Sequence, residues 1–544
     1  MPPVTKRAPR WVMAASALWC AAALPVLAAD PPPAPPAKAE NQPSVADLER
    51  RIRELEEIVH RLEAERRPPQ PAQAPAPAPV TTHEPAPSQQ PAADTAVVGG
   101  GDVGPPSQLP RADAASSTAG ETTSGDGAPR GALAGWDNDR GFFLRSQNGW
   151  FNLRLTGQVQ GDYRAFLDGR DYTDVDSFLV RRARLGIEAD LARYYEFRLL
   201  PDFSNGQSPN NTTASTRIQD AYMNVHYWDC FQIETGKFKQ PFSYEQLIQD
   251  RFVPTLERSL IDQFVPARDE GIMVHGYKLL GNRLDYGVAV SNGEINGDYD
   301  TNIGKDVNGR LVVRPFQGWA WLGGLQFGAS AGTGVEQEPI SPNPLRTPST
   351  VPWLTFNSTV RANGLRDRFS PEVEFFHGPF GFAAQYYREQ QHMSPTFAGP
   401  GSQYVLDVPI TGFYVLSTYL VTGEERTTYS MPIKPFRPFD PCHPFQGTGA
   451  WELVGRVSRV NLGEEVFEPL RISRTATISL ANPALWTRGV TEMTLGFNWY
   501  LNAWVRVQFN WEHDWFDSPV RLGPGPAGLL NQQDALLTRL QFIF

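Results

Sequence analysis

The sequence predicts an all-β protein, a transmembrane antiparallel β-barrel that follows a short α-helical coiled coil and a disordered Pro-rich linker. Three observations carry this prediction. The chain begins with an export signal, and beyond residue 30 it has no run of about 18 apolar residues that could form a membrane-spanning helix. From about residue 141 onward, apolar and polar side chains alternate in short stretches. With a mean hydropathy of -0.37, a membrane protein has to be a barrel, because only helices and closed barrels satisfy their backbone groups in lipid.

The export signal is predicted to be a signal peptide over residues 1–29. Basic residues precede an apolar stretch that ends in small residues, namely Lys6, Arg7 and Arg10, then Trp11–Leu27, then Val26-Leu27-Ala28. This order is typical of secretory signals. A retained helical anchor and a lipoprotein anchor at Cys20 are the alternatives. Pro25 argues against the first, and the bulky Trp19 argues against the second.

The net charge of -10 and the pI near 5.4 argue against a nucleic-acid partner. They also give no general support to an anion channel, so such a function must be argued from local residues. Cys230 and Cys442 remain after removal of the signal peptide, with no CxxC motif and no metal-ligand spacing. They form either one disulfide or two free thiols, and no metal or cofactor is expected.

Residues 44–66 are predicted to form a short coiled coil. Apolar residues recur at alternating spacings of three and four, with a β-branched residue at a and Leu at d: Val45, Leu48, Ile52, Leu55, Val59 and Leu62. This residue choice favours two strands in parallel coiled coils. Three heptads are stable only in an oligomer, and a lone surface helix is the alternative.

Residues 67–140 are predicted to be a linker. The stretch is rich in Pro, Ala, Ser, Thr and Gly, and it has no aromatic residue before residue 136. Such a composition cannot bury enough apolar area to become ordered. We therefore expect a disordered spacer between the coiled coil and a barrel domain over residues 141–544.

The alternation in the barrel domain places apolar and polar side chains on opposite faces of each strand. One face of residues 151–163 carries Phe151, Leu153, Leu155, Val159 and Tyr163, and the other carries Asn152, Arg154, Thr156, Gln158, Gln160 and Asp162. A soluble β-sandwich could show the same pattern. Three features favour a barrel with lipid outside and water inside. Aromatic residues lie near the ends of strands, most of the polar positions carry a charge, and the connections differ greatly in length.

Nine segments in order along the barrel domain resemble the phosphate-selective porin O/P family of outer-membrane channels: RRARLGIEADL, YEFRLLPDFSNG, IQDAYMNVHY, ETGKFKQPFSYEQL, FVPARDEGIMVHG, TGFYVLSTYLVTGEER, GAWELVGRVSR, TLGFNWYLNAWVRVQFNW and LLTRLQFIF. The resemblance covers most of the chain from about residue 141 to the end. It implies a 16-stranded barrel, usually a trimer, in which one loop folds into the lumen and forms a constriction.

The resemblance also implies an anion path of arginines along the lumen, with lysines near the constriction. Guanidinium groups match phosphate oxygens with a fixed fork of donors. By alternation, the candidates on the inner face are Arg154, Arg182, Arg184, Arg198, Arg310, Arg314, Arg456, Arg506 and Arg539. Acids on the same face, such as Glu188, Asp202 and Asp220, leave open a second interpretation in which these arginines form structural salt-bridge networks.

Two segments are candidates for the loop that enters the lumen. The first, from about Ser243 to Arg268, follows GKFKQPF, and its candidate constriction residues are Lys237, Lys239, Arg251, Arg258 and Arg268. The second is TGEERTTYSMPIKPFRPFDPCHPFQG, with Lys434 and Arg437 in a Pro-rich middle. The sequence does not decide between them.

The leading functional hypothesis is an outer-membrane porin that forms a water-filled channel for passive diffusion of small anions, with phosphate as the candidate solute. The alternative is a general diffusion porin with weak charge preference, whose coiled coil tethers the outer membrane to the cell wall. Either hypothesis places the chain in the outer membrane of a Gram-negative-type bacterium as a homotrimer, with a periplasmic N-terminal region and a cell-wall or periplasmic partner bound through residues 44–66. No nucleophile elbow, HExxH, P-loop or GxGxxG motif is present, so no enzyme is expected.

Overall fold

The computed structural model describes residues 132–137, 141–167, 176–204, 216–293, 303–395, 404–443, 445–471, 477–523 and 528–544. The predicted signal peptide, the predicted coiled coil and most of the predicted linker lie outside these ranges.

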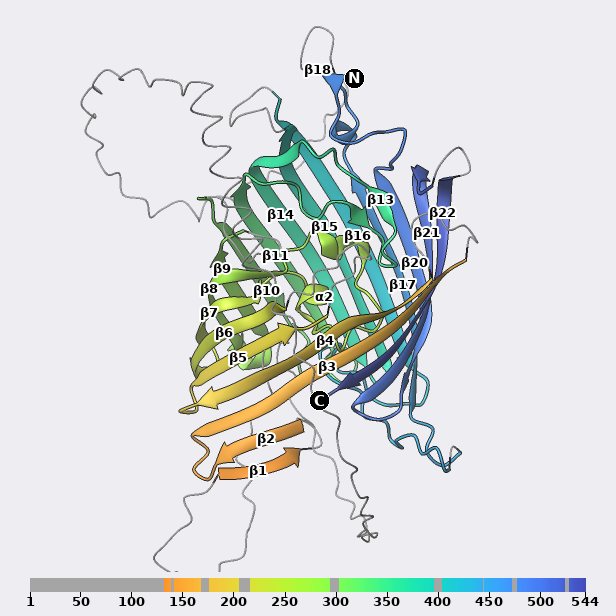
Figure 1. The fold of residues 1–544 in the computed structure, drawn as a ribbon. Coiled ribbons are helices and arrows are strands. Elements are labelled where there is room, and N and C mark those ends of the chain that lie inside the picture. The colour runs from red at the N-terminus through yellow and green to blue at the C-terminus, as the bar shows by residue number, and fades with distance from the viewer. Residues whose placement is uncertain are drawn as a thin grey trace, which may run out of the picture. The chain divides into compact units, whose positions relative to one another are not determined.

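Within the described residues, sixteen antiparallel strands form a closed barrel (Figure 1). The barrel closes where the last strand pairs with the first, with Leu540 opposite Gly161. The predicted all-β barrel and its strand number are therefore confirmed. The strands are β3 (Phe151–Phe166), β4 (Ser177–Leu191), β5 (Tyr195–Asp202), β6 (Arg217–Trp228), β7 (Phe231–Lys239), β8 (Arg268–Lys278), β9 (Leu284–Ser291), β10 (Asp306–Val313), β11 (Leu325–Glu336), β14 (Val360–His377), β15 (Phe380–Pro395), β16 (Leu406–Leu420), β17 (Ala450–Leu462), β20 (Gly489–Tyr500), β21 (Val505–Arg521) and β22 (Leu529–Ile543).

A hairpin of β1 (Ala132–Asp137) and β2 (Gly141–Ser146) precedes the barrel and pairs with the start of β3. The rings of Trp136 and Trp504 lie 5.3 Å apart, so the hairpin packs beside the turn between β20 and β21. β1 lies inside the range that the sequence assigns to the linker. Ordered structure thus begins before the predicted start of the barrel domain.

Side chains alternate between the two faces of the barrel wall as the sequence predicts. On β22 and β3, Leu540, Phe542 and Val159 are exposed on the outer face, whereas Arg539 and Gln160 are fully buried on the inner face. Because a one-residue shift in register would exchange the two faces, this agreement fixes the register of both strands.

The two ends of the barrel differ in their connections. At one end, here named the short-turn end, only two residues join β14 to β15 and β6 to β7. Long loops leave the other end. One of them holds α2 (Tyr244–Leu247) and η1 (Leu260–Gln263), and another holds η2 (Glu464–Val466). The helix α3 (Leu279–Asn282) lies at the short-turn end, in the turn between β8 and β9. Residues 421–449 are an exception, because this long segment joins β16 to β17 at the short-turn end. No helix among the described residues is long and apolar enough to cross a membrane.

An apolar core fills the barrel interior along β14–β17 and β20–β21, which the sequence analysis did not foresee. Loop residues that carry β12 (Leu345–Arg346), β13 (Pro352–Leu354) and η1 pack inside the wall, and Trp353, Ile261 and Val460 are fully buried there. A Cβ on Gly412 of β16 would lie 2.6 Å from the Ile261 side chain, so only glycine leaves room for η1 at this position. The other half of the interior, along β3–β11, keeps mainly polar inner-face side chains.

Candidate functional site

The segment between β7 and β8, residues 240–267, folds into the barrel and is here named the inserted loop. It crosses to the opposite wall, where the Leu256 N–H donates to Asn510 Oδ1 at 2.7 Å and the Leu260 N–H donates to Ser458 Oγ at 3.3 Å. The Ser243 hydroxyl caps α2 by accepting from the Gln246 N–H. The first of the two sequence candidates for an inward-folding loop therefore lies in the lumen.

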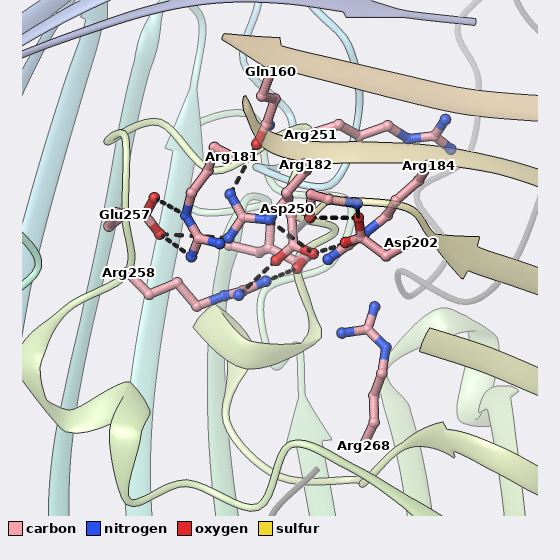
Figure 2. A network of polar contacts seen from close by, with 12 residues as sticks. Gln160, Arg181, Arg182, Arg184, Asp202, Asp250, Arg251, Glu257, Arg258 and Arg268 are labelled. Atoms are coloured by element: carbon pink, nitrogen blue, oxygen red, sulfur yellow. Dashed lines mark hydrogen bonds and ion pairs between the residues drawn. The ribbon is translucent and has the colours of Figure 1, made fainter. Parts of the chain in front are cut away.

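Asp250 fixes one side of the inserted loop to the barrel wall (Figure 2). Its carboxylate accepts from Arg184 of β4 and pairs with Arg258 of the loop itself, at 2.6 Å from Nη1. The Nε of Arg182, also on β4, lies 3.7 Å away. Three guanidinium groups thus surround one buried carboxylate.

Glu257 fixes the other side of the loop in the same way. Arg181 binds it through two nitrogens, at 2.6 Å and 2.9 Å, and Arg539 of β22 donates at 2.8 Å. Arg182 and Arg164 lie at 3.4 Å and 3.3 Å. Figure 2 shows that the β4 arginines point toward both loop carboxylates, so this part of the wall acts as an electrostatic clamp on the loop.

The strength of this clamp depends on pH, because the carboxylates of Asp250 and Glu257 must be ionised to bind the arginines. Burial by itself raises a carboxyl pKa, but Arg258, Arg182 and Arg184 outweigh it and hold the pKa of Asp250 well below its usual range. Burial alone would also raise the carboxyl pKa of Glu257, but the neighbouring arginines outweigh this effect and hold the pKa well below its usual range. Burial raises the pKa of Glu245 in the same loop to about 7, so its protonation on acidification does not weaken the fold.

We expect the inserted loop to stay anchored between pH 7 and pH 5 and to loosen only below about pH 4. Stability from a depressed carboxyl pKa is fully present above the unfolded value, about 4, and is lost as the pH falls through the folded value. Current noise of single channels recorded at pH 7, 5 and 3.5 checks this expectation. Noise that already rises between pH 7 and pH 5 would contradict it.

Residues 421–449, the second sequence candidate, also enter the barrel, from the short-turn end. Tyr244 of α2 joins the two inserted segments, because its hydroxyl lies 3.0 Å from Thr428 Oγ1 and accepts from the Tyr429 N–H at 3.0 Å. Arg426 is buried against Glu452 of β17 and holds this segment in place. The barrel interior therefore holds two segments that enter from opposite ends and contact each other.

A cavity of about 130 Å³ lies between these inserted segments and the wall from β3 to β11. Among the described residues, seven cationic and four acidic side chains line it. The cations are Arg184, Arg198, Lys239, Arg251, Arg268, Arg310 and Arg314, and the acids are Asp220, Glu234, Asp250 and Asp285. The lining is thus biased toward positive charge, although the chain as a whole is acidic.

Most of these lining cations are bound to carboxylates. Arg268 and Arg198 share Asp220, at 2.6 Å and 3.1 Å, and Arg314 donates to Asp285 at 2.6 Å. Arg184 and Arg310 pair with Asp202 and Glu372. Lys239 instead donates to the carbonyls at the end of α2, among them that of Gln246 at 2.6 Å.

Arg251 differs from the other arginines of the lining, because within the described residues it has no carboxylate at ion-pair distance. Its Nη1 donates to Thr156 Oγ1 and its Nε donates to Gln249 Oε1, each at 2.8 Å. Its Nη2 donates to no side chain or carbonyl in the described part of the chain. Arg251 therefore offers a donor to the cavity, and its charge interacts with carboxylates such as Glu188 only over longer distances.

The other sequence candidates either hold the inserted loop or lie away from the cavity. Arg506 donates to the carbonyls of Arg251 and Val253, and Arg456 donates to Thr255 and Glu492. Arg539 and Arg182 bind the clamp carboxylates, and Arg258 binds Asp250. Arg154 pairs with Asp190, and Lys237 pairs in register with Glu270 between β7 and β8.

Several residues at the site carry no signal that alternation could reveal. Thr428 and Ser430 line the cavity from the second inserted segment, and Tyr244 links the two segments. Asp250 was visible in the sequence only as one acid among several, although it binds three arginines. Cys230 and Cys442 are free thiols, and no group of three or more metal-ligating side chains occurs among the described residues.

Comparison with known proteins bears on the whole barrel. Among solved structures, the chain is similar to OmpT of Vibrio cholerae (10% identity, 72% of this chain and 99% of that chain, TM-score 0.42), DcaP of Acinetobacter baumannii (11%, 74% and 99%, 0.43) and OmpF of Salmonella typhi (11%, 73% and 99%, 0.42). Curated protein sequences give no match. The sequence model of phosphate-selective porin O and P matches residues 153–544, which is every barrel strand except the first two residues of β3. The chain therefore belongs to the phosphate-selective porin O and P family and forms an outer-membrane channel.

Proposed function

We propose that this channel passes small anions by passive diffusion and that its constriction favours phosphate. The observation that supports this proposal is the excess of seven cations over four acids around the cavity, together with Arg251, which has no ion-pair partner among the described residues. Charged side chains at a constriction select permeating ions by sign. An arginine binds phosphate oxygens with up to two parallel hydrogen bonds, which adds geometric preference to the charge effect.

A specific observation also supports a second candidate, a general diffusion porin with weak charge preference. Arg184, Arg198, Arg268, Arg310 and Arg314 each bind a carboxylate, so much of the positive charge at the cavity is neutralised locally. In this case the paired arginines shape the wall and hold the inserted loop. The predicted coiled coil would then supply a tether to the cell wall.

We further propose that the channel assembles as a homotrimer with its N-terminal region in the periplasm. The trimer form of OmpT supports the first part for a barrel of this general kind. The direction of the chain supports the second, because β1 and β2 pack at the short-turn end, and short turns face the periplasm in outer-membrane barrels. A cell-wall or periplasmic partner would reach residues 44–66 from that side.

Single-channel recording in planar bilayers separates the two candidate functions. In a KCl gradient, a constriction that prefers anions shifts the reversal potential toward the equilibrium potential of chloride, and added phosphate reduces the chloride current. A reversal potential near zero without block by phosphate would support the general porin instead.

A further inference from the structure

The cavity has an apolar strip that small inorganic anions do not need. Leu200, Tyr222, Met273 and Val312 line it from the inner faces of β5, β6, β8 and β10, and Leu247 of the inserted loop faces it as well. The inner face of a water-filled barrel is normally polar. Along β14–β17 and β20–β21, apolar inner-face side chains are covered by inserted segments, whereas these ones border the cavity.

We propose that the cavity binds amphipathic organic anions, with monoesters of phosphate that carry an apolar aryl group as the simplest class, in preference to inorganic phosphate. This inference rests on the proposed anion function and specifies its substrate class. The charged end of such a solute lies toward the cations of the cavity, and the apolar body covers the strip.

The distribution of side chains supports this two-part site. Tyr222 and Met273 belong to one apolar cluster with Phe238 and Ala289, and each of these four side chains is at least nine-tenths buried. Val312 follows Arg310 on the inner face of the same strand, so an apolar group and a guanidinium lie one strand repeat apart. A solute with a charge at one end and an apolar group at the other matches this spacing.

Gly287 shapes the wall between the two parts. It lies opposite Arg310 on one side and His275 on the other. A Cβ here would lie 3.1 Å from Pro241 and 3.7 Å from the Met273 sulfur, so a side chain would fill the space beside the apolar strip. The glycine therefore keeps open a recess where the charged and apolar parts of the lining meet.

His275 offers this recess a buried hydrogen-bond acceptor. Its ring is 2% exposed, and its Nε2 lies 3.3 Å from Asn224 Oδ1. Its Nδ1 has no hydrogen-bond partner among the described residues, although His275 lines the cavity. Because Nε2 faces an amide oxygen, it carries the ring proton, and the unpaired Nδ1 of the neutral ring is an acceptor. Buried polar atoms are normally paired, and the P–OH group of a singly protonated phosphate monoester would donate to this one.

Block of chloride current by three probes tests the proposal: inorganic phosphate, glycerol 1-phosphate and phenyl phosphate. Glycerol 1-phosphate has a polar body and so controls for size. We expect phenyl phosphate to block at a concentration about tenfold lower than the other two, because burying an apolar group of this size is worth at least a factor of ten in binding. The variants Met273→Gln and Val312→Thr should each reduce this preference, whereas Val313→Thr, on the outer face of the same strand, should keep it.

The outcomes separate this inference from the proposed function. Anion selectivity with equal block by all three probes overturns the inference and leaves the proposed function standing. A wild-type channel without anion selectivity or phosphate block overturns the proposed function itself. A preference for phenyl phosphate that survives in folded Met273→Gln and Val312→Thr channels overturns the assignment to this strip.

Discussion

Replacement of Asp250 with asparagine is expected to release the inserted loop while the barrel stays folded. The change removes the negative charge that Arg184, Arg182 and Arg258 share, and it leaves three buried guanidinium groups without this partner. Breaking a buried ion pair from one side costs about 3–5 kcal/mol. The strand ladders do not depend on this carboxylate, so the cost falls on the loop, which should become accessible to protease and should no longer narrow the channel.

Limited proteolysis of the folded barrel and single-channel recording measure the two consequences of Asp250→Asn. Cleavage within residues 240–267 and a larger, noisier current are expected together. Asp262→Asn is the matched control, because Asp262 lies in the same loop but is 3.8 Å from Arg258 and partly exposed, and such a pair contributes little. If the Asp250 variant changes only ion selectivity and its loop stays resistant to protease, the clamp does not hold the loop.

The clamp illustrates what the sequence could and could not predict. Alternation suffices to place Arg182, Arg184 and Arg539 on the inner face, because a strand in a barrel wall has one face toward lipid and one toward the interior. It cannot show what each arginine binds. Asp250 and Glu257 come from a loop whose path depends on tertiary contacts, and no local periodicity records that path.

Alternation fails where loops enter the barrel. On β16, Ile410 and Tyr414 are buried on the inner face while Phe413 and Val415 are exposed on the outer face, so the strand is apolar on both sides. A strand with one face in water would not show this pattern. Such a doubly apolar strand is the one sequence signal that could have indicated an inner face covered by other parts of the chain.

The sequence also could not show that carboxylates partly neutralise the positive charge around the cavity. The sequence places acids such as Asp220 on the inner face, but not beside particular arginines. Pairing leaves most lining arginines with little free charge, so their number alone overstates the pull on an anion. Under the proposed function, selectivity therefore depends on the few cations without an ion-pair partner, and Arg251 is the one such arginine among the described residues that line the cavity.

Replacement of Arg251 with glutamine is expected to weaken phosphate block about 10- to 100-fold. A hydrogen bond to a charged group contributes about 1.5–3 kcal/mol, which corresponds to a factor of this size in affinity. The loss of charge should also shift the reversal potential toward zero in a KCl gradient. The loop itself should hold, because its contacts with Arg506 and Gln541 use the Arg251 carbonyl rather than its side chain.

Two further variants, Arg251→Lys and Arg193→Gln, complete the test. They separate the effect of the guanidinium's donor geometry on phosphate block from the effect of its charge. Lysine keeps the charge but loses the planar fork of donors, so it should preserve anion selectivity while weakening phosphate block. Arg193 lies exposed in the turn between β4 and β5, where its side chain donates to the Asn148 carbonyl. Its replacement makes the same change in net charge at a distance from the cavity. Equal effects of Arg251→Gln and Arg193→Gln would show that phosphate responds to the total charge of the barrel and not to a site at the constriction.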